Sequence, residues 1–109
     1  MDESEVLRIE QREAWRDVLE RAADLIERRG LNKGGYSGDD GSLCVFGAIN
    51  MAVSGKPNAA SYTPHPAAVV VQQSLWSEPL ERCSITRYND HPETTGAMVV
   101  TKLREVARS

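Results

Sequence analysis

The sequence predicts a mainly α-helical fold, in which one small domain of about four helices surrounds a single core. Two observations carry this prediction. Apolar residues recur at helical spacing in several segments, and stretches rich in Gly and Pro separate these segments. A length of 109 residues also fits one domain that closes its own hydrophobic core. We therefore expect a long N-terminal helix, shorter helices after it, and irregular Gly/Pro-rich connections.

The longest predicted helix covers residues 3–29. This segment contains no Gly or Pro and is rich in Glu, Arg, Leu and Ala, which favour helices. It ends at Gly30, and glycine is the residue most often found in the left-handed position after a helix. We expect the second half of this helix to pack on the core through one apolar face, which comprises Trp15, Leu19, Ala22 and Ile26.

The start of the same helix carries apolar residues that do not continue this face. Extending the face backwards leads to charged residues, Arg12 and Arg8. The apolar residues lie on other sides of the helix and are Val6, Leu7 and Ile9. We therefore divide the chain into an N-terminal helical arm, residues 1–12, and a single globular helical domain, residues 13–109. Through its three apolar residues the arm is expected to bind a protein partner or a second copy of the chain.

A glycine-rich loop and a buried helix are expected next. Residues 31–41 contain repeated glycines and an Asp-Asp-Gly turn, which are typical of a loop. Ser42 is expected to cap a helix over residues 43–53, and Gly55 to close it. This helix is apolar on nearly every side, so we expect other helices to surround it. Gly47 inside it predicts the close approach of a neighbouring element, because glycine otherwise costs a helix up to ~1 kcal/mol.

The C-terminal half is expected to contain two further helices. Residues 67–76 fit a helical face, although the β-branched run at residues 69–71 leaves a strand as an open alternative. Residues 80–88 show no clear period and are interpreted as extended or irregular. Asp90 is expected to cap a last helix over residues 92–107. The predicted core face of that helix comprises Thr95, Val99, Leu103 and Val106.

Composition and charge argue against a nucleic-acid or membrane partner. The 16 acidic and 13 basic residues give a net charge of -3 and are interleaved along the first helix, whereas nucleic-acid binding requires clustered Lys and Arg. No segment approaches the ~20 apolar residues of a membrane-spanning helix, and the chain opens on acidic residues instead of a basic signal region. The two cysteines are too few for a disulfide scaffold, so we expect a cytoplasmic protein with free thiols.

Cys44 is a candidate catalytic nucleophile because of its predicted position in a helix. It falls in the first turn of the buried helix, where free N–H groups and the helix dipole favour a thiolate nucleophile. The base that such a nucleophile needs would be His91 or His65, and the group that orients the base would be Asn89 or Asp90. The alternative is that Cys44 is a small core residue and that Asn89 and Asp90 only cap a helix. Both interpretations stay open at this point.

No metal site and no cofactor are predicted. The potential metal ligands share neither C-x-x-C nor H-x-x-x-H spacing, and they are Cys44, Cys83, His65 and His91. The glycine-rich loop lacks the residue order of a phosphate-binding loop, and no predicted strand precedes it. We therefore expect the chain to work without a bound nucleotide or metal ion.

Three stretches, taken in order, resemble a known family. They are RAADLIERRG at the end of the first helix, CVFGAI at the start of the buried one, and ITRYNDHPETT before the last one. From about Ala14 to Ala107 the chain is similar to domain-of-unknown-function family 6197, an uncharacterised family of short actinobacterial and actinophage proteins. Leu43 and Tyr88 depart from the family pattern, which often has an aromatic residue and a Trp in these places. The resemblance implies a shared fold but no established activity.

The sequence favours a non-enzymatic protein-binding or regulatory module over an enzyme. No complete catalytic set stands out, and the apolar arm indicates a protein partner or a homodimer. The resemblance implies phage-type host interaction as one setting for such a module. Two alternatives stay open. One is a thiol-dependent hydrolase or transferase with Cys44 as nucleophile, and the other is a small-ligand binder that uses Tyr36, Arg87 and Tyr88.

Overall fold

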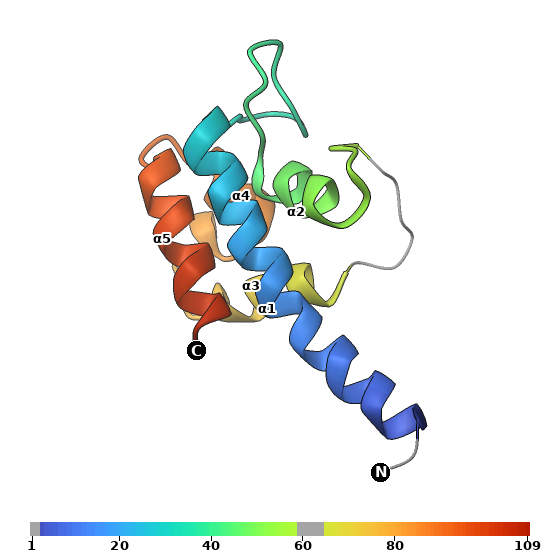
Figure 1. The fold of residues 1–109 in the computed structure, drawn as a ribbon. Helices are drawn as coiled ribbons and strands as arrows, with labels where there is room; N and C mark the ends of the chain where they lie inside the picture. Colours follow the sequence, from blue (N-terminus) through green and yellow to red (C-terminus); the bar gives the residue numbers. More distant parts are fainter. Residues whose placement is uncertain (1–2, 59–64) are drawn as a thin grey trace.

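The computed structural model of the chain shows a mainly helical fold, as predicted (Figure 1). It describes the backbone of residues 3–58 and 65–109 and the side chains of residues 14–58 and 65–109. The elements in these ranges are α1 (Glu3–Arg29), α2 (Val45–Ser54), α3 (Pro66–Ser74), the 3-10 helix η1 (Leu80–Arg82), α4 (Ile85–Asp90) and α5 (Gly96–Ala107). The described backbone forms isolated β-bridges but no strand.

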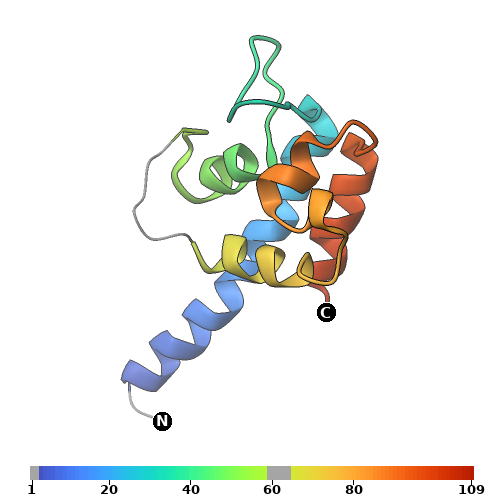
Figure 2. The same cartoon turned by 180° about the vertical axis from the view of Figure 1, so that it is seen from behind.

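The core lies around the second half of α1. Helix α5 packs along one side of α1 and α2 lies along another, while α3 and α4 cover the face that is turned to the viewer in Figure 2. The predicted apolar face of α1 is confirmed at Leu19, Ala22 and Ile26, and Trp15 is partly buried at its edge. The largest fully buried side chains come from every layer and include Leu19, Ile26, Ile49, Val71, Leu75, Val99 and Leu103.

Charged side chains border the contact between α1 and α5. The guanidinium of Arg104 on α5 lies 2.9 Å from the carboxylate of Asp24 and 2.8 Å from that of Glu27, both on α1. These hydrogen bonds raise the pKa of Arg104 above its ordinary value. Arg108 pairs with Glu20 at 2.8 Å in the same way. The α1–α5 contact is therefore apolar inside and ionic at its rim.

The N-terminal part of α1 extends beyond the other helices (Figure 1). This helix has 27 residues, and the longest extent of the structure is 48 Å. The side chains of the predicted arm, including Val6, Leu7 and Ile9, lie outside the described residues. The boundary at residue 12 and a partner role for these side chains therefore stay predictions.

Helix α2 begins two residues later than predicted. Its N-cap is Cys44, whose thiol accepts a hydrogen bond from the backbone N–H of Gly47 at 3.2 Å. Ser42 stays in the preceding loop, where its hydroxyl donates to Asp40 Oδ1 at 2.6 Å. The prediction that Ser42 is the cap was wrong because this nearby carboxylate holds its hydroxyl. Gly55 closes the helix in the left-handed conformation, as predicted, with φ of 79°.

Helix α3 includes the β-branched residues 69–71, for which the sequence had left a strand as an alternative. Residues 69–71 are helical and do not form a strand. The imidazole of His65 caps the helix by accepting a hydrogen bond from Ala67 N at 3.1 Å, and Pro66 occupies the first turn, where its missing N–H costs nothing. These local start signals outweigh the β preference of valine.

Residues 80–82 and 85–88 are helical, with a bend at residues 83–84, so the prediction of an extended or irregular segment was wrong. They form η1 and the first part of α4, which Ser84 caps. Gln72 of α3 supports the turn between the two, because its side chain donates to Cys83 O at 2.9 Å and accepts from Ile85 N at 3.1 Å. A helix of only 6 residues that depends on a side chain from another helix leaves no periodic pattern in the sequence.

The last helix begins four residues later than predicted, at Gly96. Its N-cap is Thr95, whose hydroxyl accepts a hydrogen bond from Met98 N at 3.2 Å. The prediction that Asp90 caps this helix was wrong, because Asp90 is the last residue of α4. Thr95 is exposed and leaves the predicted core face, whereas the other predicted members are buried, namely Val99, Leu103 and Val106.

Candidate functional site

The loop between α1 and α2 folds back over the start of α2 (Figure 1). Near its base, Asn32 N donates to Leu43 O at 3.0 Å. Further along, Cys44 N donates to Tyr36 O at 3.2 Å. These two bonds bring residues 34–36 alongside the first turn of the helix.

Gly47 makes this close approach possible, as the sequence predicted. A Cβ atom at this position would overlap with the carbonyl oxygen of Tyr36. Any side chain here would push the loop away from α2 and stretch the hydrogen bond from Cys44 N to that same carbonyl. The loop can therefore pack directly against α2 only because position 47 has no side chain.

The tip of the loop is stabilised by Asp40. Its carboxylate accepts hydrogen bonds from the hydroxyl of Ser42 at 2.6 Å and from Ser42 N at 3.0 Å. These bonds favour the charged form and lower the pKa of Asp40. This network holds the turn at residues 38–41 and lies apart from the site described next.

Asn89 joins the loop, α2 and α4 through its side-chain amide. Its Oδ1 accepts a hydrogen bond from Val45 N, the first residue of α2, at 2.9 Å. Its Nδ2 donates to Asn32 O in the loop and to Asp90 Oδ1, both at 2.9 Å. Asn89 is buried, with 2% of its surface exposed, so these bonds replace the water that the amide loses. Asn89 therefore fixes three segments in one position.

Asp90 connects the hydrogen bonds of Asn89 to Gly34, the first glycine of the Gly34-Gly35 pair in the loop. Its Oδ1 also accepts a hydrogen bond from Gly34 N at 3.1 Å. The next residue along the chain, His91, accepts a hydrogen bond at its carbonyl oxygen from the ammonium of Lys33. The loop is therefore attached to the end of α4 at two successive residues.

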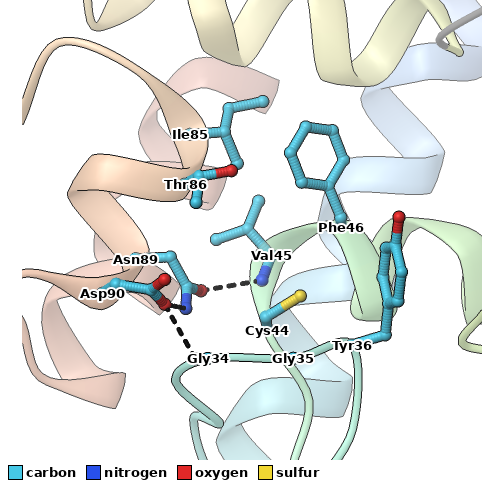
Figure 3. A pocket seen from close by; sticks show the side chains of 10 residues that line it. All are labelled: Gly34, Gly35, Tyr36, Cys44, Val45, Phe46, Ile85, Thr86, Asn89 and Asp90. Atoms are coloured by element: carbon cyan, nitrogen blue, oxygen red, sulfur yellow. Dashed lines mark hydrogen bonds between the residues drawn. The ribbon is translucent and has the colours of Figure 1, made fainter.

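A pocket of about 290 Å3 lies between the loop, the start of α2 and α4 (Figure 3). Its walls are partly apolar and partly polar, and the residues that line it are Gly34, Gly35, Tyr36, Cys44, Val45, Phe46, Ile85, Thr86, Asn89 and Asp90. The rings of Tyr36 and Phe46 stand on one side, and Asn89 and Asp90 stand on the other. The hydrogen bonds of Asn89 thus hold the two sides of the pocket in place.

The thiol of Cys44 faces this pocket between the two sides (Figure 3). Burial raises the pKa of Cys44 above its ordinary value, and the nearby Asp90 carboxylate raises it further. Hydrogen bonds from the backbone N–H groups of Gly47 and Phe46 act in the opposite direction but are smaller in effect. The thiol is therefore protonated at neutral pH and is a poor nucleophile.

The structure brings together three of the five residues considered for catalysis. Cys44, Asn89 and Asp90 line one pocket, but His91 does not line it, and neither does His65. The Nδ1 atom of His91 accepts a hydrogen bond from Glu93 N at 3.1 Å. Burial lowers the pKa of His65, whose Nδ1 caps α3. The thiol thus lacks an imidazole base among the residues that surround the pocket.

Of the three residues considered for ligand binding, only Tyr36 lines the pocket. The guanidinium of Arg87 donates to Leu80 O at 3.0 Å, outside the pocket. Tyr88 is buried, with its hydroxyl 3.5 Å from Met98 O, and burial raises its pKa. Arg87 and Tyr88 therefore lie outside this pocket, and a role in ligand binding for them stays a prediction.

Sequence reasoning missed Ile85, Thr86 and Phe46 as pocket residues. The first two escaped notice because their segment was interpreted as irregular, although the Ser-x-x-Arg start of α4 carries a cap residue that could have indicated a helix. Phe46 belongs to the helix that was expected to be surrounded on nearly every side, but it is only partly buried, and Val53 on the same helix is exposed. An aromatic ring in the first turn of α2 is thus available to the pocket.

The described residues form neither a cluster of metal ligands nor a membrane-spanning helix. Nowhere in that part of the chain do three His, Cys, Asp or Glu side chains gather closely enough to hold a metal ion. None of the described helices combines the length and apolar character that crossing a membrane requires.

The chain has no significant match among curated proteins or among solved structures. It does match a family model, and the match includes the three stretches that suggested the family from the sequence. Since that match covers residues 10–109, the chain belongs to the family of unknown function DUF6197.

Proposed function

We propose that the chain is a non-enzymatic binding module whose binding site is the pocket between the loop, α2 and α4. The observation that carries this proposal is that residues 34–36, the first turn of α2 and one face of α4 converge on one pocket of about 290 Å3. This volume lies near the lower end of the roughly 300–1000 Å3 that small-molecule sites span. The pocket therefore suits a small organic group, either free or carried on a larger partner.

The protonated state of Cys44 supports binding over thiol catalysis. A thiol enzyme needs a lowered thiol pKa and a base within reach, whereas burial raises the pKa of Cys44 and the pocket lining contains no imidazole. The amide of Asn89 uses both of its N–H groups within the protein, so it is committed to holding the pocket together. The side chain of Asn89 thus serves to shape the pocket.

A pair of variants tests whether ligands enter this pocket. Thr86 is exposed on α4 and lines the pocket, so Thr86→Trp is expected to fill it. Thr101 is exposed on α5 and lines a different pocket between α1 and α5, so Thr101→Trp is the control that would fill that pocket instead. Fragments of about ten non-hydrogen atoms are expected to bind the native protein with millimolar dissociation constants. Saturation-transfer NMR should detect them with the native protein and Thr101→Trp but not with Thr86→Trp.

Two results would contradict the proposal. One is that a varied fragment set gives no saturation transfer with the native protein. The other is that Thr86→Trp leaves the signals unchanged, which would place the fragments elsewhere. Circular dichroism of both Trp variants checks that each retains the native helix content.

A second candidate function is association through the N-terminal arm. The observation that favours it is the extension of α1 beyond the other helices (Figure 1). We propose that the arm, residues 1–12, forms a homodimer or a protein-partner contact through Val6, Leu7 and Ile9. Light scattering of the full chain and of a chain without residues 1–12 tests the homodimer. A dimeric mass that falls to a monomer on truncation supports it, and monomers in both cases contradict it.

A further inference from the structure

Among the residues that the structure describes, Asp90 is the one charged residue that lines the pocket, and its side chain is exposed to solvent there. Its Oδ1 is used inside the protein, where it accepts from Gly34 N and from Asn89 Nδ2. Its Oδ2 has no hydrogen-bond partner within residues 14–58 and 65–109, and the carboxylate forms no ion pair there. Asp90 therefore presents a negative charge that the described protein does not neutralise.

Two cations near Asp90, one in space and one along the chain, donate hydrogen bonds to backbone carbonyl oxygens. The ammonium of Lys33 donates to the carbonyl oxygen of His91, and the guanidinium of Arg87 donates to Leu80 O. Neither residue lines the pocket. Asp90 and Cys44 line the same pocket, and after burial the Asp90 carboxylate is a smaller cause of the raised pKa of the Cys44 thiol.

The rest of the lining favours an apolar group. The rings of Tyr36 and Phe46 stand opposite Asp90, the side chain of Val45 lies between the two sides, and Ile85 adds an apolar side chain from α4 (Figure 3). Aromatic faces attract cations as well as apolar stems, because the ring quadrupole is negative on its face. A carboxylate on one side and aromatic rings on the other thus favour the same kind of ligand.

We propose that the pocket binds a protonated amine carried on a short apolar stem, with Asp90 as its counter-charge. This inference rests on the proposed function and names the chemical class of the ligand. Two sources share the chemistry, namely a free amine and a Lys side chain of a partner. In both, the stem contacts the apolar walls while the ammonium donates to Asp90.

The experiment compares three probes of nearly equal shape: 2-phenylethylammonium, 2-phenylethanol and 3-phenylpropionate. Dissociation constants come from protein-observed NMR titrations of the native chain. The ammonium is expected to bind at least about fivefold more tightly than the alcohol, the scale of a partly exposed charge pair, and the carboxylate least tightly. In Asp90→Asn the preference for the ammonium over the alcohol should disappear. Since Asn keeps the Oδ1 acceptor, the bonds from Gly34 N and Asn89 Nδ2 can persist.

Glu93→Gln is the matched control. Glu93 is exposed, does not line the pocket, and lies three positions from Asp90 in the chain, so the variant removes the same charge nearby. It should keep the full preference for the ammonium at 150 mM salt, where exposed charges beyond about 8 Å are screened. A loss as large as that in Asp90→Asn would overturn the assignment of Asp90.

The outcomes separate this inference from the proposed function. Equal binding of ammonium and alcohol to the native chain overturns the cationic ligand class but leaves the pocket a binding site. No binding of any probe overturns both. Two further probes distinguish the sources, n-butylammonium and Nα-acetyl-lysine methylamide. Tighter binding of the capped lysine supports a partner side chain, and tighter binding of n-butylammonium supports a free amine.

Discussion

The two sides of α1 are held together by different forces. On the side of α5, buried apolar side chains form the interior of the contact, ion pairs border it, and a second pocket, lined among others by Gly30, Gly96 and Thr101, lies at its edge. On the side of the loop and α2, hydrogen bonds of the buried Asn89 join the segments, and a pocket of about 290 Å3 is left beside it. We call the α1–α5 side the filled half, because apolar side chains fill its interior. We call the side of the loop and α2 the positioned half, because the hydrogen bonds of Asn89 position its segments.

This difference shows how a small domain can keep a pocket without losing its fold. Apolar packing supplies stability in proportion to the area buried, but it tends to fill space. A buried amide with all its donors used is directional, so it can hold two walls at a fixed separation. The α1–α5 contact stabilises the chain, and the Asn89 network gives the opposite side its shape.

The largest effect is expected in the filled half. Leu103→Ala on α5 removes a side chain that is 1% exposed and should lower the free energy of unfolding by about 3–4 kcal/mol, within the 2–5 kcal/mol typical of such cavities. Urea denaturation measures it. Met98→Ala on the same helix is the control, because Met98 is 38% exposed and its loss should cost only about 0.5 kcal/mol. Equal losses would mean that α5 packs through a different face.

A smaller loss of stability, with a specific loss of function, is expected in the positioned half. Asn89→Ala leaves Val45 N and Asn32 O without their partner, and should lower the free energy of unfolding by roughly 2–3 kcal/mol. The variant should also lose binding of 2-phenylethylammonium at a temperature where it remains folded. Asn50→Ala, which removes a single bond to Pro57 O, should cost about 1 kcal/mol and retain binding. If both variants bind alike, Asn89 does not shape the pocket.

Gly47→Ala tests the close contact between the loop and α2. Alanine improves helix propensity by about 1 kcal/mol, yet its Cβ would overlap with Tyr36 O, so we expect a net loss of about 1–2 kcal/mol. Gly96→Ala, in the first turn of α5, is the control, because its Cβ would lie 3.7 Å from Leu31 Cβ, an ordinary contact. Thermal unfolding should show this control unchanged or slightly stabilised. A stabilised Gly47→Ala would contradict the close contact between the loop and α2.

The smallest effect concerns the thiol in the pocket. Because burial raises the pKa of Cys44, its reaction with iodoacetamide at pH 8 should be slower in the folded protein than in urea, in a Cys83→Ser background. A faster reaction in the folded state would contradict the raised pKa of Cys44 and would favour the alternative of a thiol-dependent enzyme.

The same pKa shift predicts the pH dependence of stability. Below the ordinary thiol pKa of about 9.0 the thiol is protonated in both states, so its contribution is fully present. Above that pH the unfolded chain ionises first, and stability falls as the pH rises through the folded-state pKa. The stability of the native chain relative to Cys44→Ser should therefore decline above pH 9 and stay constant between pH 6 and pH 8.

Sequence reasoning predicted the filled half well, because helical spacing records which face is buried. The face of α1 through Leu19, Ala22 and Ile26 and the face of α5 through Val99 and Leu103 both follow from periodicity. Helix ends were less predictable. Ser42 and Asp90 look like caps in sequence, but Ser42 donates to Asp40 within the loop, and Asp90 lies at the end of α4 and accepts from Gly34 N.

The positioned half could be predicted only in part. Cys44, Asn89, Asp90 and Tyr36 were singled out from local chemistry, and they meet at one pocket. Their roles could not be derived, because the bonds of Asn89 connect residues 44 and 57 positions apart and no periodicity encodes them. The six-residue helix α4 was missed for the same reason, since residues outside it support it.

The most direct test of the account is a map of where a ligand binds. Titration of 2-phenylethylammonium into the 15N-labelled chain reports on every backbone amide. We predict that the largest shift changes occur at the amides of Gly34, Gly35, Val45 and Thr86, and that they are absent from the Thr86→Trp variant. Largest changes on the α1–α5 surface, at Gly30, Gly96 and Thr101, would contradict the account.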